Sequence, residues 1–549
     1  MTQKLDKDAT ASKLHKRGPQ IAANCDNLWA LLEYTATAHP DAVHIVFRDQ
    51  IWSYAESYAL AIRASAGLQA MGIGKGDRVG LLIPNMPTYI ILCFALWRIG
   101  AVGVGLNMLY PDARIAKMLQ NVGAKMLIAR DLPEEAGRAT AIGDEVDVSV
   151  LLCQADASDL RLSQQAPSDA VLGDNSLAAL IATTGCVPPI SVTHSDLAML
   201  QFTGGTTGIP KAAMLSHGNL LTAVAMGSSG MHAVKQADEG WSAIAPFTHV
   251  TGLILYIGVN TAFAGRCVIM ERFDPAELVT QLRDGVITVL TAIPTMITAL
   301  LAQPSVQEID WDKLSLVMAG GAPIPFDLQK RFMALTGRPV LQAYGLTETG
   351  AAATMLSCVE NERHLRSVGQ AVPGVEISIR DLNDAERPMA DGEPGEICLR
   401  GANVITGYLD DPDPLSHYTG DGFFRTGDVG RTDSEGYLYI EDRLKDIIIC
   451  SGYNVYPRVV EEAVQSIAGV REVVAVGIPD AYRGETVAVA LVKEGTPLTL
   501  DQIQQALMNT LSPFEMPKYL FSFDTLPKTE NYKLSRALIR ERLLKKVGG

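Results

Sequence analysis

The 549-residue sequence has no closely spaced cysteines, no unbroken apolar run of membrane-spanning length and no excess of positive charge. Its eight cysteines form neither a CxxC pair nor a Cys/His cluster with zinc spacing, so we expect no disulfide framework and no zinc site. Dispersed single cysteines are typical of a reducing compartment, and we expect a cytoplasmic protein. The formal net charge is −15, from 46 lysines and arginines against 61 aspartates and glutamates. An acidic surface argues against a nucleic-acid partner and against docking on anionic lipid.

The most apolar segment, residues 89–106, contains Arg98 and several glycines. We therefore favour a buried helix followed by a buried strand over a membrane span. The same interpretation applies to residues 287–302, which Pro294 interrupts. The first twenty residues contain no apolar core of a signal peptide, so none is expected. We expect no integral membrane span, while peripheral membrane contact and a homodimer remain open.

Strand and helix patterns alternate in the N-terminal part of the chain. A strand pattern at 43–47, for example, is followed by a capping box over Ser53–Glu56 that opens a helix. The alternation predicts an α/β fold of layered, largely parallel sheets. Residues 131–192 are less regular, and we interpret them as surface loops and short elements. From about residue 377, short strands with glycine turns predict a β-rich subdomain, and a compact α+β unit follows. We expect a flexible tail at 1–24, a large N-terminal domain at 25–443 with its β-rich subdomain at about 365–443, and a small C-terminal domain at 444–549.

A stretch rich in glycine and threonine lies between a predicted strand at 197–202 and a predicted helix at 215–226. In a strand-to-helix turn of this composition, backbone N–H groups can converge on a phosphate, because glycine brings no Cβ and accepts φ > 0. The kinase-type P-loop is excluded in detail, because Ala212 rather than a hydroxyl residue follows Lys211. The residues predicted to form this phosphate loop are Thr203, Gly204, Gly205, Thr206, Thr207, Gly208 and Lys211.

The order Thr-Gly-Gly-Thr-Thr-Gly-x-Pro-Lys resembles the signature loop of the acyl-adenylate-forming (AMP-binding) superfamily, and the chain looks like its acyl-CoA synthetase branch. Further matches follow in the family's order and span nearly the whole chain. They are YGLTE at 344–348, Tyr408 with FRTGD at 424–428, DRLKD at 442–446, SGYNVYP at 451–457 and LPKTENYK at 526–533. The resemblance implies an enzyme that uses ATP and Mg²⁺ to convert a carboxylic acid to acyl-AMP and then transfers the acyl group to coenzyme A.

The resemblance also implies roles for individual residues. Thr347 is expected to contact phosphate, and Glu348 to bind Mg²⁺; both would also suit a helix N-terminus, which is itself an anion site. Asp428 is expected to accept from the ribose hydroxyls, with Arg443 near the ribose and phosphate. The other cofactor-binding positions that the match implies, including the adenine pocket, are Gly321, Ala322, Pro323, Gln342, Ala343, Tyr344, Gly345, Ser451, Gly452 and Tyr453.

Two lysines match family positions that take part in a movement of the C-terminal domain. Lys445 matches the hinge about which the small C-terminal domain rotates between the two half-reactions. Lys533 matches the lysine that orients the carboxylate and the α-phosphate. The family has glycine before this lysine, whereas this chain has Tyr532, which does not readily take φ > 0. Acetylation of Lys533 is a regulatory hypothesis that Tyr532 weakens, and Tyr532 is also the support for an alternative reading as a nucleotide-binding pseudoenzyme.

The acid substrate is the least determined part of the prediction. His249 corresponds to a position between the acyl pocket and the thiol tunnel, and a core histidine explains it equally well. The small apolar lining leaves room for a long or bulky acid, so we expect a medium- to long-chain fatty acid, with an aryl, cycloaliphatic or terpenoid acid as the alternative. A carrier-protein thiol is the alternative to coenzyme A. The predicted substrate-binding residues are Val250, Gly252, Leu253, Gly320 and Leu346.

Overall fold

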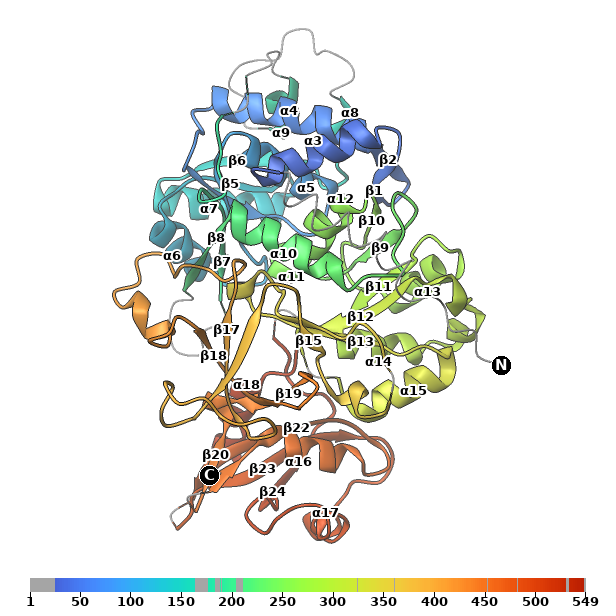
Figure 1. Cartoon of the computed structure of the whole chain (residues 1–549). Helices are drawn as coiled ribbons and strands as arrows, with labels where there is room; N and C mark the ends of the chain where they lie inside the picture. Colours follow the sequence, from blue (N-terminus) through green and yellow to red (C-terminus); the bar gives the residue numbers. More distant parts are fainter. Residues whose placement is uncertain are drawn as a thin grey trace.

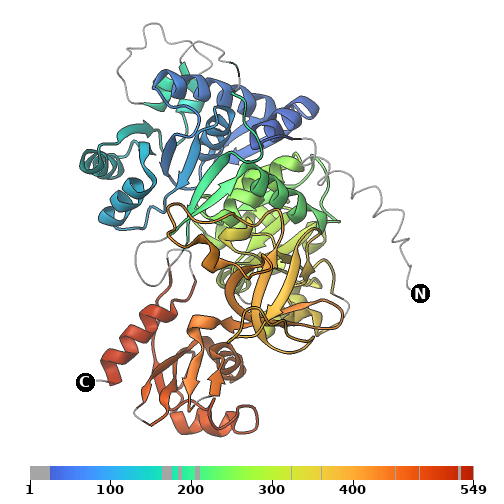
Figure 2. The ribbon, with the colours of Figure 1, turned by 60° about the vertical axis from the view of Figure 1, so that its left-hand side comes forward.

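The computed structural model describes residues 25–162, 176–182, 188, 190–203, 211–322, 324–359, 361–451, 453–480, 482–529 and 533–547. Within these residues the chain forms two large sheets, a four-stranded antiparallel sheet and a C-terminal sheet. Figures 1 and 2 both place the C-terminal unit, coloured orange to red, at one end of a larger body. The predicted fold class, α/β layers with a small C-terminal domain, is confirmed.

The first large sheet has the strand order β6-β5-β3-β4-β7-β8 and is parallel except where β8 pairs antiparallel with β7. The second has the order β15-β14-β13-β12-β11-β9-β10-β1-β2 and is parallel from β1 to β13. Their strands are β1 (Val43–Phe47), β2 (Gln50–Ser53), β3 (Arg78–Leu82), β4 (Val102–Gly105), β5 (Ala124–Arg130), β6 (Ser149–Cys153), β7 (Leu197–Phe202), β8 (Ala212–Ser216), β9 (Gly240–Ala243), β10 (Arg266–Ile269), β11 (Val289–Ala292), β12 (Leu316–Gly320), β13 (Leu341–Tyr344), β14 (Thr354–Met355) and β15 (Gln370–Ala371).

Helices cover these sheets (Figure 1). The capping box predicted at Ser53 and Glu56 is present and opens α4. All twelve residues of α5 are buried, and β4 follows it, which confirms a buried helix and strand in the most apolar segment. Among the described residues, none of the helices is long and apolar enough to cross a bilayer. The helices of this region are α3 (Leu28–Ala38), α4 (Tyr54–Ala70), α5 (Pro87–Arg98), α6 (Asp112–Val122), α7 (Pro133–Val146), α8 (Asp159–Leu162), α9 (Leu177–Ala182), α10 (His217–Ser229), α11 (Val250–Gly252), α12 (Asn260–Ala262), α13 (Pro275–Arg283), α14 (Pro294–Leu301) and α15 (Phe326–Thr336).

The predicted β-rich segment is an antiparallel sheet of β16 (Glu376–Arg380), β17 (Gly395–Arg400), β18 (Phe424–Thr432) and β19 (Leu438–Arg443). The C-terminal sheet follows, and apolar clusters pack on both of its faces. Its elements are β20 (Ile448–Cys450), β21 (Tyr453–Val455), α16 (Pro457–Gln465), β22 (Val470–Asp480), β23 (Gly484–Lys493), α17 (Leu500–Leu507), β24 (Tyr519–Ser522) and α18 (Arg536–Val547).

Two local predictions were wrong. Residues 131–153 are regular rather than irregular, because α7 leads into β6, which pairs parallel with β5. The buried residues of α7 are Ala139, Ile142 and Gly143, of which only Ile142 is strongly apolar, so the apolar period of the helix is weak. The phosphate loop also does not join a strand to a helix. It joins β7 to the antiparallel strand β8, and α10 begins after that strand with Ser216 as its cap.

Candidate active site

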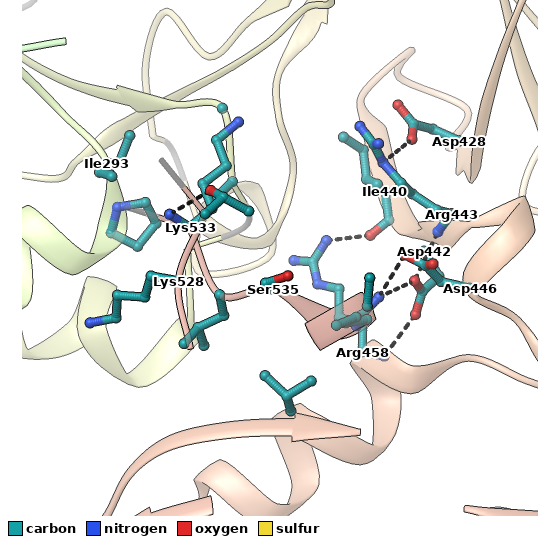
Figure 3. Close-up of a pocket in the computed structure, with 18 of the residues that line it drawn as sticks. Ile293, Asp428, Ile440, Asp442, Arg443, Asp446, Arg458, Lys528, Lys533 and Ser535 are labelled. Carbon is teal, nitrogen blue, oxygen red and sulfur yellow. Dashed lines mark hydrogen bonds and ion pairs between the residues drawn. The ribbon is translucent and has the colours of Figure 1, made fainter. Parts of the chain in front are cut away.

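A cavity of about 1750 Å³ lies where the β-rich sheet, β12, β13 and the C-terminal unit meet. Figure 3 shows Lys533 on one side of it and the paired Asp428 and Arg443 on the other. The cavity brings together residues predicted from segments far apart in the chain. Those that line it are Thr203, His249, Val250, Gly321, Ala322, Gln342, Ala343, Tyr344, Gly345, Leu346, Thr347, Glu348, Asp428, Arg443, Lys445 and Lys533.

Asp428 is held by two partners, one on the adjacent strand β19 and one at the end of β13 in the second large sheet. It faces Arg443 across the β18–β19 pairing, and the Arg443 Nε lies 3.0 Å from its Oδ1. The Tyr344 hydroxyl, at the end of β13, donates to its Oδ2 at 2.8 Å. Burial raises the pKa of Asp428, and the Arg443 guanidinium opposes that rise. The carboxylate is therefore fixed in orientation at the cavity wall. A fixed orientation suits a group expected to accept hydrogen bonds from ribose hydroxyls.

Glu348 is half-buried beside Tyr408, which the sequence also singled out. The Tyr408 hydroxyl donates to its Oε1 at 2.6 Å, and burial raises the pKa of the Glu348 carboxyl. Glu348 lies in η4 (Thr347–Thr349), a single 3₁₀ turn, so the helix N-terminus considered from sequence is absent at this position. Within the described residues no cluster of three His, Cys, Asp or Glu could hold a metal. This donor set fits Mg²⁺ bound through one carboxylate and substrate phosphates, since Mg²⁺ is commonly held in that way.

Lys533 already lies inside the cavity. A Cβ added to Gly321, just beyond β12, would meet its Nζ at 3.4 Å, and Gly321 has φ +76°. Burial and the nearby Arg443 lower the pKa of the Lys533 ammonium to about 8. An amine with a lowered pKa in a cavity is a candidate for catalysis.

His249 is half-buried and lines the cavity. It precedes α11 and the π-helical segment η1 (Leu253–Val259), and its Nδ1 accepts from the Thr251 backbone N–H at 3.2 Å. Burial and the Lys533 cation lower the pKa of His249 to about 3. The imidazole is therefore neutral near pH 7, and its position between an acyl pocket and a thiol tunnel stays a prediction.

The phosphate-loop lysine has two partners that the sequence reasoning missed. The Lys211 Nζ lies 3.1 Å from Asp411 Oδ2 and 3.2 Å from His417 Nε2, and His417 lies 2.7 Å from the same Asp411 oxygen. These contacts, that of His417 first, lower the pKa of Asp411 to about 2. His417 lines the cavity and packs edge-on against Tyr408. Asp411 follows Tyr408 closely in the chain, and His417 ends the 3₁₀ turn η6 (Pro414–His417). Their closeness to the Tyr408 motif was the available sequence signal.

The predicted acyl residues divide into two groups. Val250 and Leu346 line the cavity, whereas Leu253, Gly252 and Gly320 do not. Leu253 is buried in the core, and a Cβ added to Gly252 would lie 2.2 Å from the Pro246 carbonyl oxygen. An apolar wall that the sequence reasoning missed comes from α14 and the start of α15. It consists of Ile293, Pro294, Thr298, Ala299, Ala302, Ile324, Pro325 and Leu328.

Three predicted cofactor residues lie outside the cavity lining. Lys211 is exposed at its edge, and Ser451 and Tyr453 belong to the β20–β21 hairpin of the C-terminal unit. The Tyr453 ring is exposed and stacks on Phe514 at 4.5 Å. The remaining predicted positions, Gly204, Gly205, Thr206, Thr207, Gly208, Pro323 and Gly452, and also Tyr532, lie outside the described residues.

Comparison with known proteins agrees with this geometry. The sequence matches the family described as AMP-binding enzyme over residues 32–409, and the AMP-binding enzyme C-terminal domain over residues 459–533. It is 31% identical over 532 residues to a long-chain-fatty-acid–CoA ligase of Bacillus subtilis, covering 94% of each chain. It is 30% identical over 508 residues to a feruloyl-CoA synthase of Amycolatopsis, covering 92% of this chain and 97% of that one.

Solved structures give the same picture. ATP-bound MatB from Rhodopseudomonas palustris superposes with a TM-score of 0.85 at 29% identity, over 95% of this chain and 100% of that one. The apo form of MatB covers the same shares of both chains, with a TM-score of 0.76. The arrangement described above is thus more similar to the ATP-bound form.

Proposed function

The chain belongs to the AMP-binding enzyme family, and from that premise we propose that it joins a medium- to long-chain fatty acid to coenzyme A. Membership makes it an AMP-forming acid–thiol ligase; the acid and the thiol are the proposal. In the first step a carboxylate oxygen bonds to the α-phosphorus of ATP and pyrophosphate leaves. In the second, the coenzyme A sulfur bonds to the acyl carbon and AMP leaves. The observation that carries the proposal is the convergence of Glu348, Asp428 and Lys533 on one cavity.

The nucleoside is assigned to the Asp428 side of the cavity. Asp428 can accept from both ribose hydroxyls, because Tyr344 and Arg443 hold its carboxylate still. Gly321 and Ala322, on the wall near Lys533, bring no bulky side chain into the cavity, which leaves room for a flat base. The Tyr344 hydroxyl is bound to Asp428, so its ring is fixed in place to stack on that base.

The phosphates are assigned to the Glu348 side. Glu348 would hold Mg²⁺, which when bound neutralises charge on phosphate oxygens. Tyr408 keeps the Glu348 carboxylate oriented through its 2.6 Å hydrogen bond. Thr203 and Lys211 end the phosphate loop at the cavity's edge, and we assign them to the β- and γ-phosphates. Asp411 and His417 hold the Lys211 ammonium near that position when no phosphate is present.

Lys533 is assigned to the first step. Its ammonium would neutralise charge that develops on the α-phosphate and would orient the attacking carboxylate. The closer similarity to ATP-bound than to apo MatB supports this assignment. For the second step we propose that the C-terminal domain, from residue 444 onward, turns about Lys445. That residue lies in η7 (Leu444–Asp446), between the two sheets that would move apart.

The pH dependence of the first step should report Lys533. We expect kcat/KM for ATP to fall as the pH rises through about 8, because Lys533 is a cation below its lowered pKa and neutral above it. Initial rates of acid-dependent ATP–pyrophosphate exchange across that range check this. Lys533→Arg stays charged throughout, so its lower rate should not decline over the same range. The same decline in both proteins would assign the pH dependence to another group.

The acyl wall supports the choice of acid. The side chains of α14 and the start of α15 that face the cavity are aliphatic or small, which suits an apolar tail. The relative named long-chain-fatty-acid–CoA ligase supports a fatty acid. The relative named feruloyl-CoA synthase supports an aryl acid as the second candidate.

A panel of acids tests this proposal. We expect AMP and acyl-CoA to form together with saturated fatty acids of medium to long chain, and much more slowly with short-chain and aryl acids. Preference for aryl acids would establish the second candidate instead. A carrier-protein thiol that competes well against coenzyme A would overturn the assignment of the acceptor. Nucleotide binding without AMP release for every acid would indicate a pseudoenzyme.

A further inference from the structure

Hydrogen bonds tie the segment that carries Lys533, residues 533–535, to residues 527–529. The Thr529 N–H donates to the Lys533 carbonyl at 2.6 Å, and the Ser535 N–H donates to the Pro527 carbonyl at 3.0 Å. The Lys533 N–H in turn donates to the Thr529 hydroxyl at 3.3 Å. Arg536, the first residue of α18, follows this segment directly. Contacts that fix the position of Arg536 therefore also fix the backbone from which the Lys533 side chain extends into the cavity.

Arg536 lies among three carboxylates: it is hydrogen-bonded to Glu461 and Asp442, and Asp446 of η7 lies 3.5 Å from its Nη1. Its Nη2 and Nε lie 2.7 and 3.2 Å from the two oxygens of Glu461 on α16, which is a bidentate pairing. Its Nη1 lies 2.7 Å from Asp442 Oδ1. Glu461 also accepts from the Ala475 backbone N–H at 2.9 Å. Glu461 and Ala475 belong to the C-terminal unit, as Arg536 does. The Glu461–Arg536 pair therefore stays intact if that unit moves as a whole.

Asp442 belongs to the other side of the junction. It lies on β19 of the β-rich sheet, and its side chain is 1% exposed. Its second oxygen accepts from the backbone N–H of Arg458 in the first turn of α16, at 2.8 Å. Asp442 also immediately precedes Arg443, which pairs with Asp428 (Figure 3). The Asp442–Arg536 pair thus ties the base of the Lys533 segment to the strand that positions Asp428.

We propose that Arg536 is the positioning residue for Lys533. By pairing with Asp442 across the junction, it stabilises the arrangement in which Lys533 points into the cavity. The inference rests on the proposed function, because Lys533 serves the first half-reaction. The hinge residue Lys445 lies between Asp442 and the C-terminal sheet, so rotation about it separates Arg536 from Asp442 but not from Glu461. The pair therefore favours acyl-AMP formation and contributes little to the second step.

The direct test is Arg536→Gln, measured in the two half-reactions separately. We expect acyl-AMP formation to slow about tenfold, and thioester formation from supplied acyl-AMP to stay within about twofold of wild type. Asp442→Asn should show the same split, since it keeps the shape and removes the charge. Arg536→Lys should recover part of the loss. Lys545→Gln, on the same helix and paired with exposed Glu541, is the matched control and should change neither rate.

A double mutant separates positioning from general damage. In the Lys533→Ala background, Arg536→Gln should slow acyl-AMP formation by less than about twofold, because no lysine remains to be placed. Equal losses in both half-reactions, or full additivity with Lys533→Ala, would overturn the proposal. So would an unchanged rate of acyl-AMP formation in Arg536→Gln.

A second measurement does not depend on turnover. Hydrogen exchange of the backbone amides of Lys533 and Ser535 should be faster in Arg536→Gln and Asp442→Asn than in wild type or Lys545→Gln. Exchange unchanged by either junction variant would overturn the proposal. If wild type formed no acyl-AMP from any acid, the proposed function would fail, while this exchange result would still show whether Arg536 holds the segment.

Discussion

Replacing Lys533 with alanine will slow acyl-AMP formation by about 10²- to 10³-fold and leave thioester formation from supplied acyl-AMP within about threefold of wild type. The ammonium lies inside the cavity in the described arrangement, next to Gly321 and opposite Asp428 and Arg443. Its removal takes away a charge that we assign to the α-phosphate. In the proposed second step the C-terminal domain has turned about Lys445, and this lysine has left the cavity. Rapid-quench measurement of each half-reaction with purified intermediates checks both numbers.

Lys518→Ala is the control for that experiment. Lys518 belongs to the same C-terminal unit but pairs with Asp480 on the surface, so neither half-reaction should change. Comparable losses in both half-reactions of Lys533→Ala would contradict the two-arrangement account. They would show instead that this lysine contributes to both steps or to the stability of the domain.

Replacing Glu348 with glutamine will lower the rate of acyl-AMP formation by about 10²-fold and raise the Mg²⁺ concentration needed for half-maximal rate. Glutamine preserves the size of the side chain and its hydrogen bond with Tyr408 but offers the metal a neutral oxygen. Titration of the rate with Mg²⁺ at fixed ATP measures both effects. Tyr408→Phe, which removes the orienting hydrogen bond but keeps the charge, should cause a smaller loss. An unchanged Mg²⁺ requirement in Glu348→Gln would show that residues other than Glu348 bind the metal.

Much of the fold was predictable because its elements have strong local signals. The buried helix α5 and the strand after it follow from an apolar run too broken for a membrane span, and α4 follows from the capping box at Ser53. The antiparallel strands after residue 376 follow from glycine turns between short β-branched runs. Signals of this kind act within a few residues, so tertiary packing did not have to be known.

The hairpin at the phosphate loop shows where local reasoning fails. The segment AAMLSHGNL contains a strand followed by a helix, and its alanines suit either. Pairing with β7 decides in favour of the strand from Ala212 to Ser216, and that pairing is a tertiary fact. The helix α7 was missed because its local signal is weak: Ile142 is the one strongly apolar residue among the three that it buries.

The candidate site could be predicted where chemistry is concentrated in a motif. Glu348, Asp428 and Lys533 come from three separate motifs, and the structure brings all three to one cavity. The residues that support them carry no such signal. His417 beside Lys211 and Arg536 beside Asp442 are ordinary polar residues until the fold places a partner within hydrogen-bond distance.

Acid-dependent ATP–pyrophosphate exchange without coenzyme A tests the central claim most directly, because it reports formation of acyl-AMP alone. We expect labelled pyrophosphate to enter ATP when a fatty acid of medium to long chain is present. The exchange should be lost with Lys533→Ala and should not require coenzyme A. Folded, nucleotide-binding protein that gives no exchange with any acid of the panel would contradict the account.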